Sequence, residues 1–167
     1  RSYKKDLVDL YVNRDQHSFS TQVTDLDNIQ NPSIHSLLSS KYHEAQMHRL
    51  NIHAEIPDPV IHNYLTDLDL AVVLGHLMDN AIDGARKASE GFISLAYFDE
   101  EDCQSFIIES TIAEEQVPLS MMSTQLSHPE GGIGVNAVQD ILERYPNTSF
   151  SVRSQNHKMM QILEMRP

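Results

Sequence analysis

The segment LGHLMDNAIDGARKA, at residues 74–88, is predicted to be a helix that carries polar side chains beside its apolar face. The amide oxygen of Asn80 is a hard, neutral ligand of the kind that suits Mg²⁺, an ion that usually keeps several waters and is shared with substrate phosphates. Asp79 and Arg86 are expected to point to solvent. At 100° per residue, a narrow stripe suited to the border of a cleft contains His76, Asn80, Asp83 and Lys87.

A second interpretation gives these residues an ordinary structural role. Asn80 would bond a nearby backbone group, and Asp83 would pair with Lys87 at the i,i+4 spacing. Short motif matches are often false positives, so the spacing by itself favours this structural interpretation.

Glycines at the start of the next predicted helix point to a different kind of site. Gly131, Gly132 and Gly134 stand where a long loop, residues 112–130, becomes the helix of GGIGVNAVQDILERY. Small residues let a ligand approach the backbone, and the free N–H groups of a first helical turn bind anions without a cation. Glycines also serve loop flexibility, so this pattern alone is weak. Combined with a metal-ligand Asn on another helix, it indicates a Mg-nucleotide cleft beneath a lid.

The elements that must position these residues alternate between helix and strand. Apolar spacing predicts helices over residues 31–49 and 66–88, and a strand over residues 51–56. Two hairpins are expected, FISLAYF with QSFIIES around the acidic DEEDC turn, and SFSVRSQ with KMMQILEM. The resulting fold class is α/β, a two-layer α/β sandwich with helices on one face of a mixed sheet.

Length, charge and cysteine content restrict the class of protein. The 167 residues fit one domain, or one domain with a short helical appendage. The formal net charge of −12 argues against nucleic-acid partners and against membrane contact by this segment, because phosphate contacts need clustered cations. The single cysteine, Cys103, excludes an internal disulfide and suits a reducing compartment, so a cytoplasmic location is expected.

Two motifs in order resemble a known family. LMDNAIDGA resembles the N box, and GGIGV the glycine box, of the GHKL-type ATP-binding domains shared by gyrase-type ATPases, heat-shock chaperones and sensor histidine kinases. NPSIHSLLSSKYHEAQMHRLNIHAEIP is similar to the helix-to-strand entry of bacterial peptide-sensing (quorum-sensing) histidine kinases. The resemblance covers roughly residues 31–145, and the ordered set is much more specific than either box.

The resemblance implies the Bergerat-type ATPase fold, with ATP and Mg²⁺ as cofactors. Asn80 would coordinate the Mg²⁺ that bridges the ATP phosphates, and Asp83 would support the helix side of the pocket. The segment from about Ile112 to Glu130 would be the ATP lid. The residues implied for phosphate binding are Gly132 and Gly134 with the N–H groups of Ile133 and Val135.

The same resemblance implies a domain organisation and partners. Residues 1–49 would be the remnant of a helical dimerisation and phosphotransfer region, and residues 50–167 the ATP-binding catalytic domain. The chain would form a homodimer through its N-terminal helices and act with a response regulator. It would be the cytosolic part of a membrane-anchored bacterial sensor.

Three positions in the ATP site depart from the family pattern. Ser110 stands where the kinase strand before the lid ends in an Asp or Asn that contacts adenine, although a hydroxyl can also bond an amino group directly or through water. His76 replaces an Asn, or the Glu base of the gyrase type; a neutral imidazole can be a ligand. The lid lysine is absent, with Ser127 and His128 nearby, and its charge matters because phosphoryl transfer depends on electrostatic stabilisation.

The phosphate acceptor is the fourth departure. RSYKKDLVDL shows no His-Asp-x-x-Asn type box. Either Lys5 and Asp6 replace the pair in a degenerate box, or the acceptor histidine lies before residue 1.

Three functions remain open from the sequence. The first is a histidine kinase catalytic domain that binds Mg-ATP and passes the γ-phosphoryl group to a histidine outside or missing from this chain. The second is a degenerate nucleotide-binding or scaffold domain of the same fold without phosphotransfer. The third, an ATP-driven clamp of the gyrase or chaperone type, lacks its Glu base here.

Overall fold

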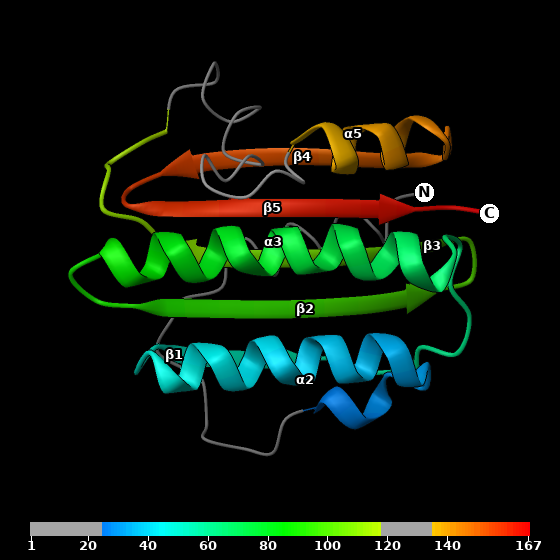
Figure 1. Ribbon diagram of the computed structural model, residues 1–167, viewed down its shortest axis with the longest axis horizontal. Helices are drawn as coiled ribbons and strands as arrows, with labels where there is room; N and C mark the ends of the chain where they lie inside the picture. Colours follow the sequence, from blue (N-terminus) through cyan, green and yellow to red (C-terminus); the bar gives the residue numbers. More distant parts are fainter. Residues whose placement is uncertain (1–24, 118–134) are drawn as a thin grey trace.

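The computed structural model describes residues 25–117 and 135–167. In this part of the chain, helices are interspersed with one single strand and two strand pairs (Figure 1). Their bounds are η2 Asp25–Asn28, α2 Pro32–Met47, β1 Asn51–Glu55, α3 Asp67–Lys87, β2 Phe92–Glu100, β3 Cys103–Thr111, α5 Val135–Glu143, β4 Thr148–Gln155 and β5 Lys158–Met165.

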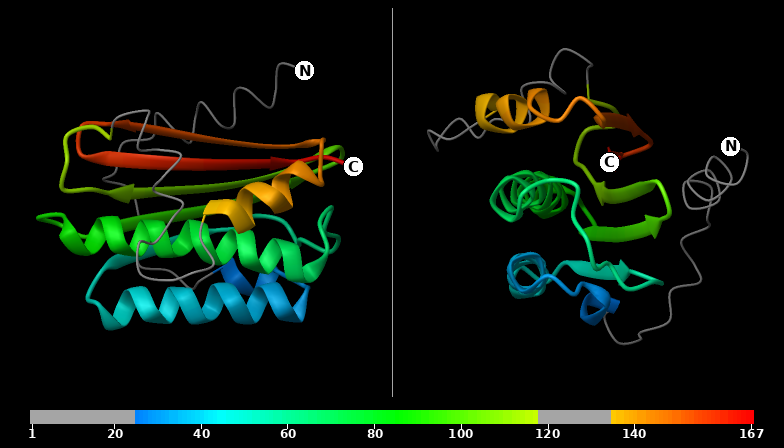
Figure 2. Two further views of the ribbon diagram at one scale, coloured as in Figure 1. Left: turned by 45° about the horizontal axis from the view of Figure 1, so that its top comes forward. Right: turned by 90° about the vertical axis from the view of Figure 1, so that its right-hand side faces the viewer.

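The strands form one mixed sheet in the order β1-β2-β3-β5-β4. β1 pairs with β2 in parallel, and the other neighbours are antiparallel. The right-hand view of Figure 2 shows α2, α3 and α5 on the same side of this sheet. The two-layer α/β sandwich predicted from the sequence is therefore confirmed.

Both long helices start at side-chain caps. The Asn31 side chain accepts hydrogen bonds from the backbone N–H groups of Ser33 and Ile34, and Pro32 occupies the first turn. Thr66 caps α3 by accepting from the backbone N–H of Asp69. These caps satisfy N–H groups that a helix otherwise leaves without partners, so the predicted helix starts are confirmed.

The first hairpin is tighter than the sequence suggested, and the second has the two-residue turn that the sequence predicted. Only Glu101 and Asp102 connect β2 to β3, because the outer residues of the acidic DEEDC segment extend the two strands. Asn156 and His157 connect β4 to β5, and both have positive φ, 52° and 59°. Two such residues form the kind of turn that matches the twist of antiparallel strands.

One hydrophobic core lies between the helices and the sheet. α3 buries its apolar face completely, and α2 contributes Ile34, Leu38 and Ala45 to the same core. The sequence interpretation placed α2 in a dimerisation region at residues 1–49. Residues 1–24 lie outside the described part of the chain, so the division at residue 49 stays a prediction.

The opposite face of the sheet carries a smaller apolar cluster. It consists of Ala96, Ile107, Met160 and Ile162, with Phe98 packed against it. Across residues 25–117 and 135–167, none of the helices has the length and apolar character needed to cross a membrane.

Candidate functional site

Asn80 lies half-buried on α3, and its side chain is held by a strand that is distant in sequence. The amide nitrogen of Asn80 donates a hydrogen bond to Oε1 of Gln161 on β5, at 3.3 Å. Gln161 is 1% exposed, and its own amide nitrogen donates to the backbone carbonyl of Leu77, at 3.0 Å. Asn80 therefore bonds the side chain of Gln161. The structural interpretation expected a nearby backbone group as its partner.

Ser110 is completely buried on β3, on the face of the sheet that α3 covers. Its hydroxyl oxygen finds no hydrogen-bond partner among the described residues, where it is the one buried side-chain polar atom in that condition. A buried hydroxyl without a partner costs about 1–3 kcal/mol. Such a group calls for a specific explanation, and a bound ligand is one of the few available.

Gly84 is where α3 comes closest to the end of β3. A Cβ atom built on Gly84 would lie 3.0 Å from Cγ2 of Ile112, 3.4 Å from the carbonyl oxygen of Thr111 and 4.0 Å from the Ser110 hydroxyl. The absence of a side chain at residue 84 thus lets the helix rest against the strand end and places Ser110 directly beneath it. Ile112 belongs to a small buried apolar cluster with Val117 and Met159.

Helix and sheet match in register here. Asn80 and Gly84 lie one turn apart on α3. On the sheet, Gln161 pairs with Ile108, and Met159 pairs with Ser110, two residues further along β3. One turn of α3 therefore spans about the same length as two residues of a strand. Asn80 lies against Gln161, and Gly84, one turn later, lies against Ser110.

The other site residues predicted on α3 remain on its polar stripe. His76 and Asp83 are half-buried, one turn on either side of Asn80. Val135 is the first residue of α5, so a helix does begin where the glycine motif ends. Gly132, Ile133 and Gly134 lie outside the described residues, as does the predicted lid from residue 118 onward.

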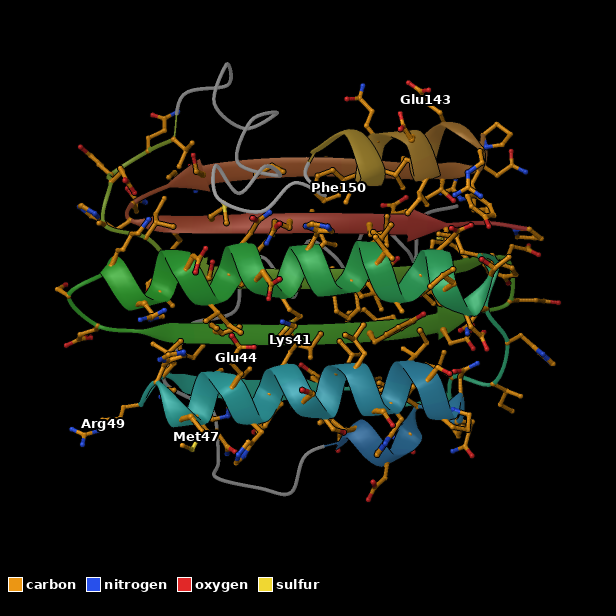
Figure 3. All side chains as sticks on the ribbon, in the orientation of Figure 1. Lys41, Glu44, Met47, Arg49, Glu143 and Phe150 are labelled. Atoms are coloured by element: carbon orange, nitrogen blue, oxygen red, sulfur yellow. The ribbon has the colours of Figure 1, made fainter. Side chains whose placement is uncertain are left out.

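Asp79 was expected to point to solvent, and that prediction is wrong. Its carboxylate accepts a 2.5 Å hydrogen bond from Nζ of Lys41, which projects from α2 toward α3 and also pairs with Glu44 at 3.2 Å (Figure 3). Partial burial opposes the charge of Lys41, but the two carboxylates outweigh it and raise the pKa of the amine. The helical wheel could not include the second helix, α2, whose Lys41 meets Asp79 on that side of α3. Arg86 is exposed, as expected.

A second polar cluster joins the start of α3 to the end of α5. Asp69 accepts two hydrogen bonds from the guanidinium of Arg144, at 3.0 and 2.9 Å, and one from the Tyr145 hydroxyl, at 2.6 Å. The hydrogen bonds from Tyr145 and Arg144 lower the pKa of Asp69. The Tyr145 oxygen also accepts from the backbone N–H of Thr66. We call Asp69, Arg144 and Tyr145 the clasp. It fixes the C-terminal end of α5, the helix that follows the glycine motif, against the start of α3.

A cavity of about 290 Å³ lies at the β4–β5 turn, on the sheet face away from α3. Its lining includes Glu109, Arg153, Lys158 and Met160. Glu109 and Ser110 are successive residues of β3, and side chains alternate along a strand, so this cavity is separate from the surface that holds Ser110 and Asn80.

Sequence reasoning missed Gln161, Gly84 and the clasp. A signal for Gln161 exists in KMMQILEM, where a glutamine interrupts an apolar strand. For the clasp there is no local signal, because Asp69 and Arg144 are 75 residues apart.

Comparison with known proteins identifies relatives of this arrangement. The family model described as "GHKL domain" matches residues 65–166. A search of curated protein sequences finds no significant match.

Solved structures of histidine kinases are similar in fold. The nucleotide-free catalytic domain of histidine kinase ThkA superposes with a TM-score of 0.63 at 14% identity, covering 82% of this chain and 91% of that one. The Acinetobacter baumannii histidine kinase AdeS gives 0.59 at 17% identity, covering 98% and 76%. ThkA in complex with the response regulator protein TrrA gives 0.61 at 14% identity, covering 82% and 40%. At these identities the likeness establishes a shared fold.

Proposed function

The chain belongs to the GHKL domain family, and from that premise we propose that it is the ATP-binding catalytic domain of a sensor histidine kinase. Its fold is that of histidine kinase catalytic domains. The observation that carries the proposal is the buried, unpartnered hydroxyl of Ser110 beneath Gly84, one helical turn from Asn80. A free hydroxyl next to a close backbone approach and an amide ligand suits a nucleotide better than it suits a closed core.

The residues present fit Mg-ATP by their chemistry. Ser110 offers a hydroxyl that can donate to or accept from an adenine edge, and the apolar side chains of Ile112 and Met159 lie beside it. Asn80 offers an uncharged amide oxygen for Mg²⁺. The start of α5 at Val135 offers backbone N–H groups to phosphate, together with the predicted Gly132, Ile133 and Gly134.

Each group has a distinct part in the proposed reaction. Bound Mg²⁺ would neutralise charge on the phosphates and align the γ-phosphoryl group. Ser110 orients the base, Asn80 holds the metal, and Asp83 supports the helix side of the pocket. The receiving histidine would be one outside or missing from this chain.

We extend the proposal to the parent protein. ThkA is found in complex with a response regulator protein, and we assign a partner of the same class to the parent of this chain. Dimerisation through the N-terminal helices, membership of the peptide-sensing kinases and a cytosolic position beneath a membrane anchor are parts of the same proposal. The departures at Ser110, His76 and the lid keep a degenerate nucleotide-binding domain as the second candidate.

Calorimetric titration with a non-hydrolysable ATP analogue, with and without Mg²⁺, tests the proposal. We expect binding that Mg²⁺ strengthens and that Asn80→Asp abolishes with little loss of fold. The introduced carboxylate cannot donate to Gln161, so two oxygens would face each other at that contact. The control is Arg86→Gln on the exposed side of α3, which should bind like the wild type.

The outcomes separate the candidates. Unchanged affinity in Asn80→Asp would remove the metal-ligand assignment. The absence of binding at millimolar analogue would overturn ATP binding by this chain and leave only the fold. Binding without phosphoryl transfer to any histidine-containing segment, in a longer chain that carries the N-terminal helices, would favour the degenerate domain.

A further inference from the structure

Gln161 makes two hydrogen bonds that link the core to the candidate metal ligand. Its amide nitrogen donates to the carbonyl oxygen of Leu77, and its amide oxygen accepts from the side chain of Asn80. Leu77 and Asn80 belong to the same turn of α3, so a single buried side chain from β5 spans that turn. With 1% exposure, Gln161 has no access to solvent partners.

The donor-to-acceptor direction of these two hydrogen bonds is fixed at the carbonyl of Leu77. A backbone carbonyl has lone pairs and no proton, so it accepts and never donates. Gln161 must therefore present its nitrogen to Leu77, and its oxygen is left to face Asn80. Asn80 must then present its nitrogen to Gln161, because two amide oxygens repel each other.

The bond to Gln161 also determines where the side-chain oxygen of Asn80 points. The nitrogen and oxygen of a side-chain amide point in directions about 120° apart, so turning the nitrogen toward β5 turns the oxygen away from the sheet. An amide without a fixed partner presents its oxygen or its nitrogen at similar cost, and only the oxygen can bind a cation. A metal ligand held by a second residue in this manner is a recurrent device in metal sites.

We infer that Gln161 is a positioning residue for the Mg²⁺ site, which sets the amide orientation of Asn80 and so presents its oxygen to the metal. The inference rests on the proposed function, because it assumes that Asn80 meets Mg²⁺. It assigns to β5, a strand outside both sequence motifs, a share in metal binding.

The chain offers a matched control in Gln104. This residue is also a 1% exposed glutamine on a helix-facing strand position. Its nitrogen donates to the carbonyl of His62, and its oxygen accepts from the Tyr97 hydroxyl. It lies six residues before Ser110 on β3, about 20 Å away along the strand. Gln104→Met therefore removes the same buried amide at a place that does not touch Asn80.

The experiment compares nucleotide affinity with and without Mg²⁺ in the wild type, Gln161→Met and Gln104→Met. The informative quantity is the ratio of the two dissociation constants, which measures the gain from metal. In Gln161→Met we expect this ratio to fall about tenfold, as for one lost orienting hydrogen bond, with metal-free affinity nearly unchanged. In Gln104→Met the ratio should match the wild type even where the melting temperature falls.

A second variant, Gln161→Glu, tests the bond to Asn80 separately. It retains an oxygen that can accept from Asn80, but the donation to Leu77 is lost and a buried carboxylate oxygen then faces the Leu77 carbonyl, so its stability is expected to fall. We expect its metal gain to stay nearer to the wild type than that of Gln161→Met. In addition, the side-chain NH₂ signals of Asn80 in the ligand-free protein should show slowed hydrogen exchange, which requires no variant and no nucleotide.

Each result has one meaning. A wild-type metal gain retained in Gln161→Met, or equal losses with and without Mg²⁺, overturns the positioning role while ATP binding stands. Rapid exchange of the Asn80 amide in the wild type overturns it as well. A wild type whose affinity does not respond to Mg²⁺ overturns the proposed metal site and this inference together.

Discussion

The buried polar groups near the two ends of α3 differ in whether they have hydrogen-bond partners. At the N-terminal end, both carboxylate oxygens of Asp69 are engaged by Arg144 and Tyr145. Four turns later, the same helix covers the Ser110 hydroxyl, which no described residue bonds. A buried polar group whose hydrogen bonds are all made joins elements of the structure together. A buried polar group without a partner lowers stability and calls for an explanation, such as a ligand that supplies the missing bond.

The contrast also separates two roles within the candidate site. The clasp around Asp69 fixes the end of α5, so it determines where that helix lies. Asn80 and Ser110 are the residues proposed to contact the metal and the base, so they should determine what binds. Stability and affinity should therefore respond to different substitutions, and three predictions test that separation.

The largest effect is expected from Asp69→Ala. This change removes three charge-assisted hydrogen bonds from a carboxylate whose side chain is 10% exposed, and we expect the free energy of unfolding to fall by about 2 kcal/mol. Arg144 is 59% exposed and regains water, which limits the loss. Urea denaturation measures the change. Nucleotide affinity in the folded protein should stay within about twofold of the wild type.

An Asp69→Ala protein of normal stability that no longer binds nucleotide would reverse the comparison. The N-terminal half of α3 would then belong to the binding surface.

Ser110→Ala should act in the opposite sense and by a smaller amount. Removing a buried hydroxyl that lacks a partner should leave the free energy of unfolding unchanged or raise it by up to about 1 kcal/mol. Affinity for the ATP analogue should fall about fivefold, because the group proposed to contact the base is lost. Denaturation and calorimetry on the same preparation measure both quantities.

Ser105→Ala is the control for Ser110→Ala, since Ser105 lies on the same strand with its side chain on the opposite face. A marked loss of stability in Ser110→Ala would mean that the hydroxyl has a structural partner in solution. The binding assignment of Ser110 would then fail.

The smallest effect concerns pH. Because the pKa of Asp69 is lowered in the folded state, its contribution to stability is complete above the unfolded pKa of about 3.8 and is lost as the pH falls through the folded pKa. The stability difference between the wild type and Asp69→Asn, which cannot titrate, should be constant from about pH 7 to pH 5 and shrink below about pH 4. Urea midpoints at several pH values measure it. A difference that already shrinks above pH 6 would contradict the assignment to this carboxylate.

Much of the fold was predictable because its signals are local. The caps at Asn31 and Thr66, the apolar stripe of α3 and the alternation in the hairpins each depend on residues within a few positions of one another. The stripe also placed Asn80 and Asp83 at the margin of the core. The error at Asp79 has the same origin, because a helical wheel contains no information about Lys41 on another helix.

The amino-acid sequence by itself determined the elements, their order, the fold class and the two motifs that identify the GHKL family. Tertiary structure alone decided which polar groups distant in sequence meet. Gln161 reaches Asn80 across 81 residues, and Asp69 meets Arg144 across 75. The physical reason is that periodicity and capping are short-range properties of the chain, whereas the pairing of buried polar atoms depends on the register in which a helix is packed against a sheet, and that register is set by the whole core at once.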